Sequence, residues 1–415
     1  MLQQVPLAAW PLWGGSAAAL AQACRNGANM STTQLLHATA YYPGFLRQFY
    51  KREPRLIGES YEKQLAALMY ECFGWADFWK THLEAMGAFE VQVAVSNAEP
   101  LQRAWAREHG HRVQDSAWRS DILCAQIAYY QPAVVVLVDG AFDGRFARYV
   151  KQTFRCVKLI GSYDGLAGEH VDAMRGFDFV LACLENTARY YSQNGLRGYY
   201  FKRAFESGIL DRLPARGPVV PVSFIGSMNV TGNAHWTRIE TLGSAARRLP
   251  LVWYGERQGP WEWFRRLCGC WRRADLSTSF ALCRLRPALR RLERVNQAPV
   301  YGLRMYQALR DSLVSLNVHI DSARMEAGNM RLFEATGVGT CLVTDWKENL
   351  QKYFEPDREV VVYKCCEELV EKVMYLLGHP AQREAIATAG QRRCLRDHRL
   401  VDEVQRLGDT IRHWL

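Results

Sequence analysis

Two charged side chains, Arg331 and Glu334, stand close together between two apolar runs of the sequence. The runs, 313–320 and 341–343, are typical of buried strands, and residues 330–336 between them favour a short helix. A strand, a helix and a second strand make half of a parallel α/β sheet, whose ligands bind beyond the carboxyl ends of the strands. An arginine and a glutamate at that edge could bind an anion and a hydroxyl group, respectively.

The start of this short helix predicts a phosphate-binding site. Asn329 is a favourable N-cap, and two glycines end the helix about two turns later. The backbone amides of Met330 and Arg331 would face an anion, with the positive end of the helix dipole behind them. The guanidinium of Arg331 adds a fork of hydrogen-bond donors. Glu334, one turn into the helix, would accept hydrogen bonds from a ribose diol.

The two glutamates of this region form a recognisable pattern. Glu326 and Glu334 are separated by seven residues, and Glu334 opens a Glu-Ala-x-Gly-x-Gly segment that leads into a strand. This resembles the Glu-x7-Glu donor-site signature of the group-1 GT-B glycosyltransferases. The resemblance implies that Glu334 holds the nucleotide ribose and that Glu326 contacts the donor sugar. The chain departs from the usual pattern between the glutamates, where it has Ala-Gly-Asn-Met-Arg.

A longer string narrows the resemblance. The chain is similar to CgeB-like glycosyltransferases in three short pieces, Asn329-Met-Arg-Leu-Phe-Glu334, Asn317-x-His319 and Thr344-Asp345. The similarity is specific over 218–397 and weaker over 41–204. It implies a GT-B fold of the α/β class, with two Rossmann-like domains facing across a cleft and a C-terminal helix that crosses back.

The first half of the chain alternates predicted strands and helices, which specifies a mainly parallel sheet. Residues 133–138 form the clearest buried strand, and residues 56–87 favour one long helix. Asp139 and Asp164 each follow a strand and precede a glycine, at the edge where ligands are met. Either could contact an acceptor or act as a base in an inverting displacement, although an Asp-Gly pair also simply makes turns. The Glu-x7-Glu resemblance instead favours retention of the anomeric configuration.

The second half opens on a fresh strand followed by a glycine-bearing loop. Gly226 and Ser227 come directly after this strand, and Tyr254 ends the next one. Such a glycine lets the backbone approach a phosphate, but the Gly-x-Gly-x-x-Gly fingerprint of nicotinamide and flavin sites is absent. The predicted donor-binding residues are therefore Gly226, Ser227, Tyr254, Asn317, Asn329, Met330, Arg331 and Glu334, and the catalytic candidates are Asp139, Asp164, His319 and Glu326.

Residues 258–297 interrupt the α/β pattern with tryptophans among many arginines. A basic stretch of this kind suits an anionic membrane surface or a phosphate-linked lipid acceptor. The simpler interpretation is a helical insertion with solvated arginines. Nucleic acid is the least favoured partner, because no known binding motif is present.

These observations set the expected domains: an N-terminal extension over 1–30, an acceptor domain over 31–212, a nucleotide-sugar domain over 213–397 that carries the insertion 258–297, and a terminal helix over 398–415. The extension lacks the basic start and compact apolar core of a signal peptide. The 12 cysteines show no disulfide-module spacing, which favours a reducing cytoplasm. Peripheral contact with the inner face of the membrane remains open.

The predicted function is metal-independent transfer of a sugar from a nucleotide-sugar donor to a glycan, lipid-linked or protein acceptor, as in the biosynthesis of cell-surface glycans. The chain has no Asp-x-Asp pair and no zinc-site spacing, so no metal or other cofactor is expected. The formal charge of +10 suits an anionic partner such as a nucleoside diphosphate. Two alternatives stay open: a nucleotide-binding relative without catalysis, and a nucleotide-sugar epimerase of GT-B type.

Overall fold

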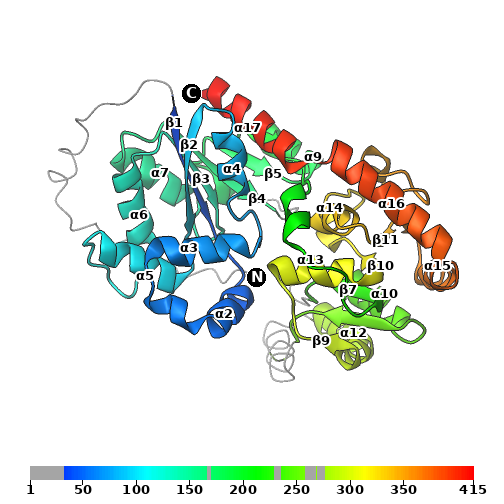
Figure 1. The fold of residues 1–415 in the computed structure, drawn as a ribbon. Helices are drawn as coiled ribbons and strands as arrows, with labels where there is room; N and C mark the ends of the chain where they lie inside the picture. Colours follow the sequence, from blue (N-terminus) through cyan, green and yellow to red (C-terminus); the bar gives the residue numbers. More distant parts are fainter. Residues whose placement is uncertain (1–31, 166–169, 229–234, 258–267, 269–275) are drawn as a thin grey trace. The chain divides into compact units, whose positions relative to one another are not determined.

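The computed structural model describes residues 32–165, 170–228, 235–257, 268 and 276–415. The chain divides into two compact units, one containing residues up to Phe201 together with Val401–Leu415, the other Lys202–Leu400. Each unit is built on a six-stranded sheet in which all paired strands are parallel (Figure 1). The predicted α/β class is thereby confirmed.

The first unit has the strand order β2-β1-β3-β4-β5-β6. Its strands are β1 (Thr33–Thr39), β2 (Phe89–Val95), β3 (Val134–Val138), β4 (Leu159–Asp164), β5 (Phe179–Ala182) and β6 (Gly198–Tyr200). Its helices are α2 (Pro43–Arg52), α3 (Tyr61–Tyr70), α4 (Phe78–Glu84), α5 (Glu99–Glu108), α6 (Trp118–Tyr130), α7 (Gly144–Thr153), α8 (Val171–Met174) and α9 (Glu185–Gln193). Strand β3 is buried over its first four residues, as its unbroken branched-apolar sequence requires.

One predicted helix of this unit is wrong. Instead of a single helix over 56–87, α3 ends at Tyr70 and α4 begins at Phe78. Between them Cys72, Gly74 and Ala76 have φ values of 53°, 63° and 42°, in the left-handed region where an α-helix cannot continue. Apolar spacing alone did not reveal this break.

The terminal helix α17 (Leu400–Trp414) packs on the first unit, which confirms the predicted crossing back. The ring of Trp414 lies 4.9 Å from that of Phe179. Gly408 sits so close to α4 that an added Cβ would lie 2.8 Å from Leu83 Cδ2. A larger side chain at this glycine would therefore separate the two helices.

The expected boundary between the domains, 212/213, differs from the observed one. The structure groups 202–212 with the second unit, because this segment is tied to residues near 398. Phe205 donates its backbone N–H to the His398 carbonyl at 2.8 Å and accepts that of Leu400 at 2.9 Å. Backbone pairing, rather than the proline- and glycine-rich composition of 213–218, thus accounts for the observed boundary.

The second unit has the strand order β12-β11-β10-β7-β8-β9. Its strands are β7 (Val220–Ile225), β8 (Leu251–Tyr254), β9 (Asn296–Gln297), β10 (Ser312–Asn317), β11 (Cys341–Asp345) and β12 (Val361–Tyr363). Its helices are α10 (Trp236–Ala245), α12 (Leu276–Arg294), α13 (Gly302–Arg310), α14 (Met330–Gly337), α15 (Cys366–Gly378) and α16 (Pro380–Asp397). This is the Rossmann order, and its topological switch point lies between β7 and β10.

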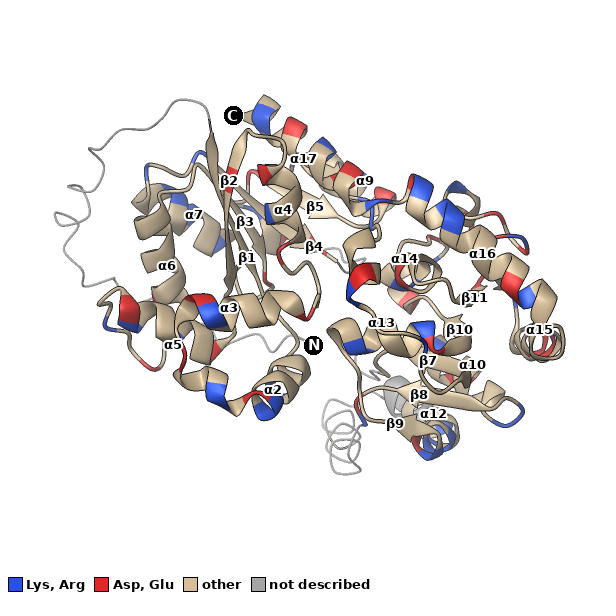
Figure 2. Ribbon diagram, viewed as in Figure 1, with Lys and Arg blue, Asp and Glu red and all other residues tan. Residues whose placement is uncertain are grey.

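Two predicted segments lie partly or wholly outside the described residues: the extension 1–30, and the insertion, of which 258–267 and 269–275 are not described. The part that is described includes α12, whose Leu285, Leu289 and Leu292 join the core of the unit. Gly243 of α10 lies against Ala288, so α10 and α12 pack closely. Positions of Lys and Arg are coloured blue along the α12 ribbon in Figure 2. Membrane contact through this segment stays a prediction.

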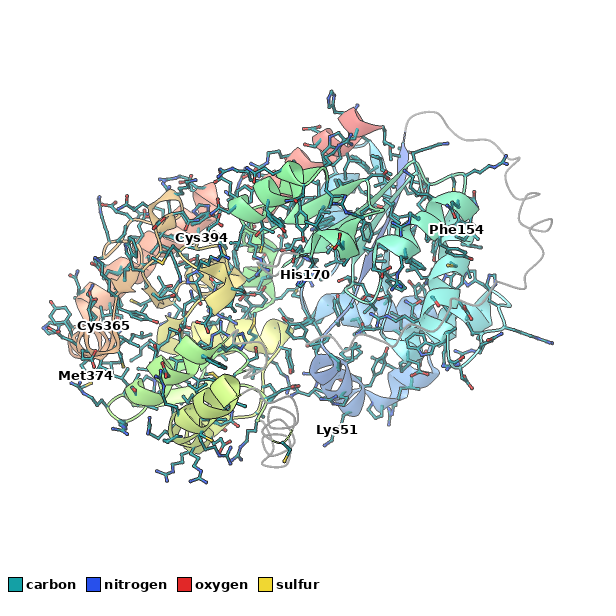
Figure 3. The ribbon with its side chains drawn as sticks, turned by 180° about the vertical axis from the view of Figure 1, so that it is seen from behind. Lys51, Phe154, His170, Cys365, Met374 and Cys394 are labelled. Carbon is teal, nitrogen blue, oxygen red and sulfur yellow. The ribbon has the colours of Figure 1, made fainter. Side chains whose placement is uncertain are left out.

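Among the described residues, no helix has the length and apolar character needed to cross a bilayer. Side chains fill both units: Phe154, at the end of α7, belongs to the core of the first, and Cys394, on α16, is buried in the second (Figure 3). The ten described cysteines are all free.

We predict that acid destabilises the first unit through His37. This fully buried histidine of β1 stacks on Trp79, and burial lowers its pKa from 6.5 to about 3. The unfolded chain takes up a proton below pH 6.5 that the folded chain refuses, so stability is complete above pH 6.5 and falls as the pH drops toward 3. Urea unfolding at pH 7, 5.5 and 4.5 measures the effect, with a slope of up to about 1.4 kcal/mol per pH unit from this group.

The variant His37→Leu should flatten that slope, whereas His413→Leu, at an exposed position, should leave it unchanged. Burial lowers the pKa of His235 and of His398 as well, so part of the slope will persist in His37→Leu. An unchanged slope in His37→Leu would contradict the assignment.

Candidate functional site

The candidate site lies at the switch point of the second sheet. Strands β7 and β10 are parallel neighbours that end at Ile225 and Asn317, and the helices that follow them are α10 and α14. Parallel strands place the amino ends of their following helices at one edge of the sheet, where anions bind. Two helix N-termini therefore compete for the role of phosphate site.

The N-terminus of α10 is already occupied by a carboxylate. Asp321 Oδ2 accepts hydrogen bonds from the backbone N–H groups of Trp236 at 2.7 Å and Thr237 at 3.3 Å. A negative charge is stabilised there by the unpaired amides and the helix dipole. Asp321 lies in the loop between β10 and α14, so this loop closes the N-terminus that the first strand–helix unit would otherwise offer to a phosphate.

The N-terminus of α14 has a different arrangement. Asn329 is the N-cap, as expected, but its side chain forms no cap hydrogen bond. It instead exchanges hydrogen bonds with Asn317, at 2.6 Å and 3.3 Å, and Asn317 also donates to Thr344 Oγ1 at 2.9 Å. The amides of Met330 and Arg331 are thus left without the expected side-chain cap.

Arg331 and Glu334 form an ion pair on the first turn of α14. Arg331 Nη1 lies 2.9 Å from Glu334 Oε2, but the two groups are not aligned for a hydrogen bond. Arg331 Nη2 donates to the carbonyl oxygen of Ile225, at the end of β7, at 3.2 Å. The side chains are only 13% and 11% exposed, so Glu334 already compensates the charge that a phosphate would meet.

His319 and Asp345 form a second polar pair across the ends of β10 and β11. The backbone N–H of His319 and its Nδ1 lie 3.0 Å and 2.7 Å from Asp345 Oδ1. Burial raises the pKa of Asp345, but His319 and Lys347 outweigh this effect and hold it at about 2. Asp345 is therefore a carboxylate at neutral pH. His319 Nε2 is buried and has no hydrogen-bond partner among the described residues.

The loop after β7 is held to β8. Gly226 donates its backbone N–H to the Tyr254 carbonyl at 3.1 Å and accepts the indole N–H of Trp253 at 2.9 Å. Ser227 is exposed at the next position. These residues lie at the predicted edge of the sheet, and their role in donor binding remains a prediction.

Sequence reasoning did not find Arg238, which joins the two strand-end loops. This residue of α10 donates from Nε and Nη2 to the Val318 carbonyl, at 3.1 Å and 2.7 Å, and from Nη1 to the Ser227 carbonyl at 3.0 Å. Burial lowers its pKa to about 10, a shift that Asp345 and Asp321 partly offset. No spacing signal marked it, because its partners are backbone carbonyls on loops 11 and 80 residues away.

Glu326 lies on the loop that precedes α14. Its backbone N–H donates to the Ala323 carbonyl at 3.0 Å. The loop is anchored one residue later, where Asn349 bonds both the N–H and the carbonyl of Ala327, at 2.6 Å and 3.0 Å. The fold thus fixes the backbone near Glu326, and its predicted contact with a sugar stays a prediction.

The two carboxylates of the first unit differ in their surroundings. Asp139 is fully engaged: Oδ2 accepts from Arg119 and from Ser96, and Oδ1 accepts the N–H of Ala141 at 2.9 Å. Asp164 accepts the hydroxyl of Tyr191 at 2.6 Å. With every carboxylate oxygen bonded, Asp139 stabilises the strand end and is a poor candidate for a base.

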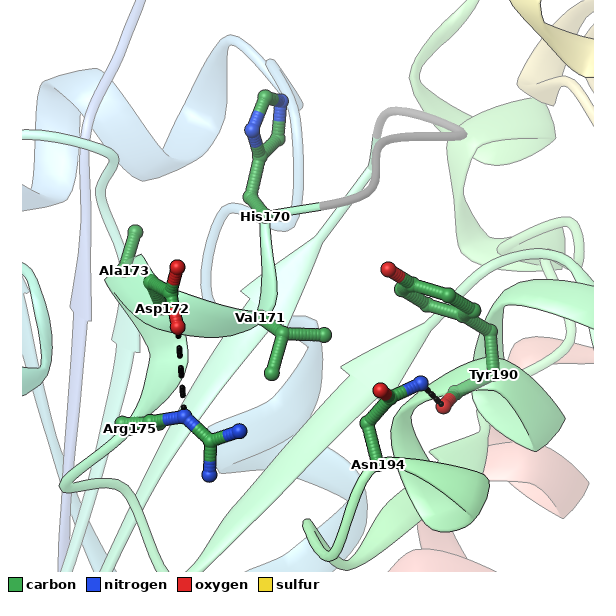
Figure 4. A pocket seen from close by; sticks show the side chains of 7 residues that line it. All are labelled: His170, Val171, Asp172, Ala173, Arg175, Tyr190 and Asn194. Carbon is green, nitrogen blue, oxygen red and sulfur yellow. Dashed lines mark hydrogen bonds and ion pairs between the residues drawn. The ribbon is translucent and has the colours of Figure 1, made fainter.

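An open hollow of about 430 Å³ lies in the first unit beside α8 and α9. Its lining is mostly polar and consists of His170, Val171, Asp172, Ala173, Arg175, Tyr190 and Asn194 (Figure 4). None of the predicted site residues lines it. Within the described ranges, no three His, Cys, Asp or Glu side chains are grouped closely enough to hold a metal ion.

The chain resembles known proteins in sequence and in structure. Residues 238–409 match the family described as glycosyl transferase-like. The structure resembles sucrose-phosphate synthase from Thermosynechococcus elongatus with a TM-score of 0.56, at 11% identity over 92% of this chain and 98% of that one. The chain has a GT-B fold.

Further GT-B structures are similar to the same extent. HepE of Anabaena, solved in complex with UDP, gives a TM-score of 0.54 at 11% identity, over 92% of this chain and all of that one. A glycosyltransferase from Rickettsia africae gives 0.53 at 9% identity, over 92% and 98%. No curated protein matches the sequence. The predicted resemblance to GT-B glycosyltransferases is confirmed, and the narrower one to CgeB-like enzymes stays a prediction.

We predict that Arg238 stabilises this GT-B unit. In Arg238→Met the carbonyls of Val318 and Ser227 lose their hydrogen-bond donor at a buried position, which should lower the free energy of unfolding by about 2–4 kcal/mol. Arg284→Met is a matched control, because Arg284 on α12 makes an exposed ion pair with Glu240 of α10, worth at most about 1 kcal/mol. Urea unfolding measures the free energy of unfolding of both variants. Equal losses would show that the hydrogen bonds of Arg238 do not stabilise the unit.

Proposed function

We propose that the protein transfers a sugar from a nucleotide-sugar donor to an acceptor, and that the donor diphosphate binds at the N-terminus of α14. The observation that carries this proposal is the difference between the two helix N-termini at the switch point. Asp321 fills that of α10, whereas the side chain of Asn329 turns away from that of α14. The N-terminus of α14, which the side chain of Asn329 does not cap, has the geometry for an anion.

Arg331 and Glu334 give this site its chemical selectivity. A diphosphate beside α14 would attract the Arg331 guanidinium, which is held in place by its bond to the Ile225 carbonyl. Glu334 would then be released to accept hydrogen bonds from the ribose hydroxyls. The ion pair seen in the structure is thus a resting arrangement that keeps two charged groups compensated until the nucleotide binds.

The site can also assist the reaction itself. As the glycosidic bond to the diphosphate breaks, negative charge grows on the leaving group. The amides of Met330 and Arg331, the helix dipole and the Arg331 side chain would stabilise that charge more in the transition state than in the bound donor, which lowers the barrier. Asp164, at the end of β4, is the remaining carboxylate candidate for the acceptor side.

HepE was solved with UDP and with UDP-glucose, which supports a nucleotide sugar as the class of donor. A screen of donors and acceptors would identify the sugar. It would also decide whether the acceptor is a glycan, a lipid-linked molecule or a protein. We place the reaction in the cytoplasm, since the described cysteines are all free. Peripheral contact with anionic lipid through 258–297 is part of the same proposal.

We predict that Arg331→Ala and Glu334→Ala each reduce transfer by about 100-fold or more, because each removes a group that contacts the donor. Arg358→Ala and Glu355→Ala are matched controls, since these residues form an exposed ion pair with the same three-residue spacing in the same unit. Initial rates with a panel of nucleotide sugars give the answer. Rates near wild type in both site variants would refute the site.

We also predict that transfer continues at the wild-type rate in excess EDTA, because fixed amides and Arg331 supply the positive charge. The measurement is the rate after dialysis against EDTA, with and without added manganese. Strict dependence on manganese would overturn this part of the proposal. Analysis of products with the donor alone separates the alternatives: an epimerised donor indicates an epimerase, and nucleotide binding without turnover indicates a non-catalytic relative.

A further inference from the structure

One ring nitrogen of His319 has a hydrogen-bond partner, and the other has none among the described residues. Its Nδ1 lies 2.7 Å from the Asp345 carboxylate, and an ionised carboxylate can only accept a hydrogen bond. Nδ1 must therefore carry a proton, and in the neutral form of the ring Nε2 is then an acceptor. The side chain is only 1% exposed, and no described residue donates to Nε2. A buried acceptor without a donor is costly and requires an explanation.

The fold holds this ring firmly. Arg238 binds the carbonyl of the preceding residue, Val318, with two hydrogen bonds, and Asp345 accepts from both the backbone N–H and the ring of His319. Lys347 Nζ lies 3.3 Å from the other oxygen of Asp345 and in turn donates to the Arg324 carbonyl. The ring orientation is thus fixed before any ligand arrives.

The direction of Nε2 follows from the order of the strands. Strand β10 lies between β11 and β7. Nδ1 faces Asp345 at the end of β11, and because the two ring nitrogens point in diverging directions, Nε2 points away from the Asp345 carboxylate. Across β10 from β11 is β7, the other strand of the switch point at which the donor is proposed to bind.

We propose that His319 Nε2 accepts a hydrogen bond from a hydroxyl group of the donor sugar, and that Asp345 is a positioning residue which fixes the tautomer needed for this. The inference rests on the proposed function and adds a residue that distinguishes the intact nucleotide sugar from the free nucleoside diphosphate. Nucleotide and phosphates contact α14, whereas the hydroxyl reaches the end of β10. The bound hydroxyl supplies the donor that Nε2 lacks.

Two substitutions of His319 separate its two nitrogens. The amide of Asn coincides with the position of Nδ1, so His319→Asn keeps a donor for Asp345 and removes Nε2. The amide of Gln reaches the position of Nε2, so His319→Gln keeps a polar group there and loses the bond to Asp345. Isothermal titration with UDP and UDP-glucose, GDP and GDP-mannose, and dTDP and dTDP-glucose gives the affinity ratio of each sugar nucleotide to its diphosphate.

We expect His319→Asn to lower this ratio by about tenfold for the pair that wild type binds, while the affinity for the free diphosphate is unchanged. His319→Gln should retain part of the ratio. Asp345→Asn should lower it too, and nitrogen NMR of its His319 should show the proton moving from Nδ1 to Nε2. This last readout also covers the case in which His319→Asn fails to fold.

Other outcomes overturn the inference in distinguishable ways. Parallel loss of affinity for diphosphate and sugar nucleotide would mean that His319 only supports the fold. Unchanged affinities with a lower turnover would make His319 a base instead. If Arg331→Ala binds the free diphosphate as tightly as wild type, the proposed nucleotide site itself fails. If binding of the free diphosphate requires Arg331 but the affinity ratio is unchanged in His319→Asn, only this inference fails.

Discussion

The carboxylate of Asp321, bonded to the first-turn amides of α10, determines which of two helix N-termini in the second unit remains for a ligand. Parallel pairing of β7 with β10 brings two helix N-termini to one edge, and an uncompensated N-terminus attracts an anion. By closing the first of these with its own side chain, the β10–α14 loop leaves α14 for a ligand. The same contact draws the loop toward α10, where Arg238 binds its beginning through the Val318 carbonyl.

This arrangement explains why so many polar groups are buried at the strand ends. Asn317 with Asn329, and His319 with Asp345, tie β10 to its neighbours through side chains rather than through the ladder of the sheet. Buried polar groups are tolerated when they are satisfied, and they then fix a single geometry. Two of the buried side-chain nitrogens that have no hydrogen-bond partner among the described residues, one each of His319 and Arg331, lie on the two segments that flank the proposed ligand.

At the corresponding edge of the first sheet, the carboxylates are hydrogen-bonded to neighbouring groups of the protein. Asp139 is bonded at both oxygens and Asp164 is bonded to Tyr191, so the strand ends are consolidated by their own side chains. The hollow beside α8 and α9 has a mostly polar lining, which includes neither of these carboxylates. The two units share the α/β class, but the polar groups at their strand ends are bonded differently. This agrees with the rule that function resides in sites rather than in folds.

The sequence by itself determined the α/β class and the helix at 330–336, and it predicted a site that includes Asn329, Arg331, Glu334 and His319, because apolar periodicity, caps and strand ends are local signals. Local signals also misled, as at 56–87, where left-handed residues interrupt an otherwise helical pattern. Only the tertiary structure decided that Asn329 bonds Asn317, that Arg331 bonds the Ile225 carbonyl, and that Arg238 and Asp321 hold the loops. Each of these contacts depends on which strands become neighbours, and that choice brings together residues up to 106 positions apart through contacts no local pattern encodes.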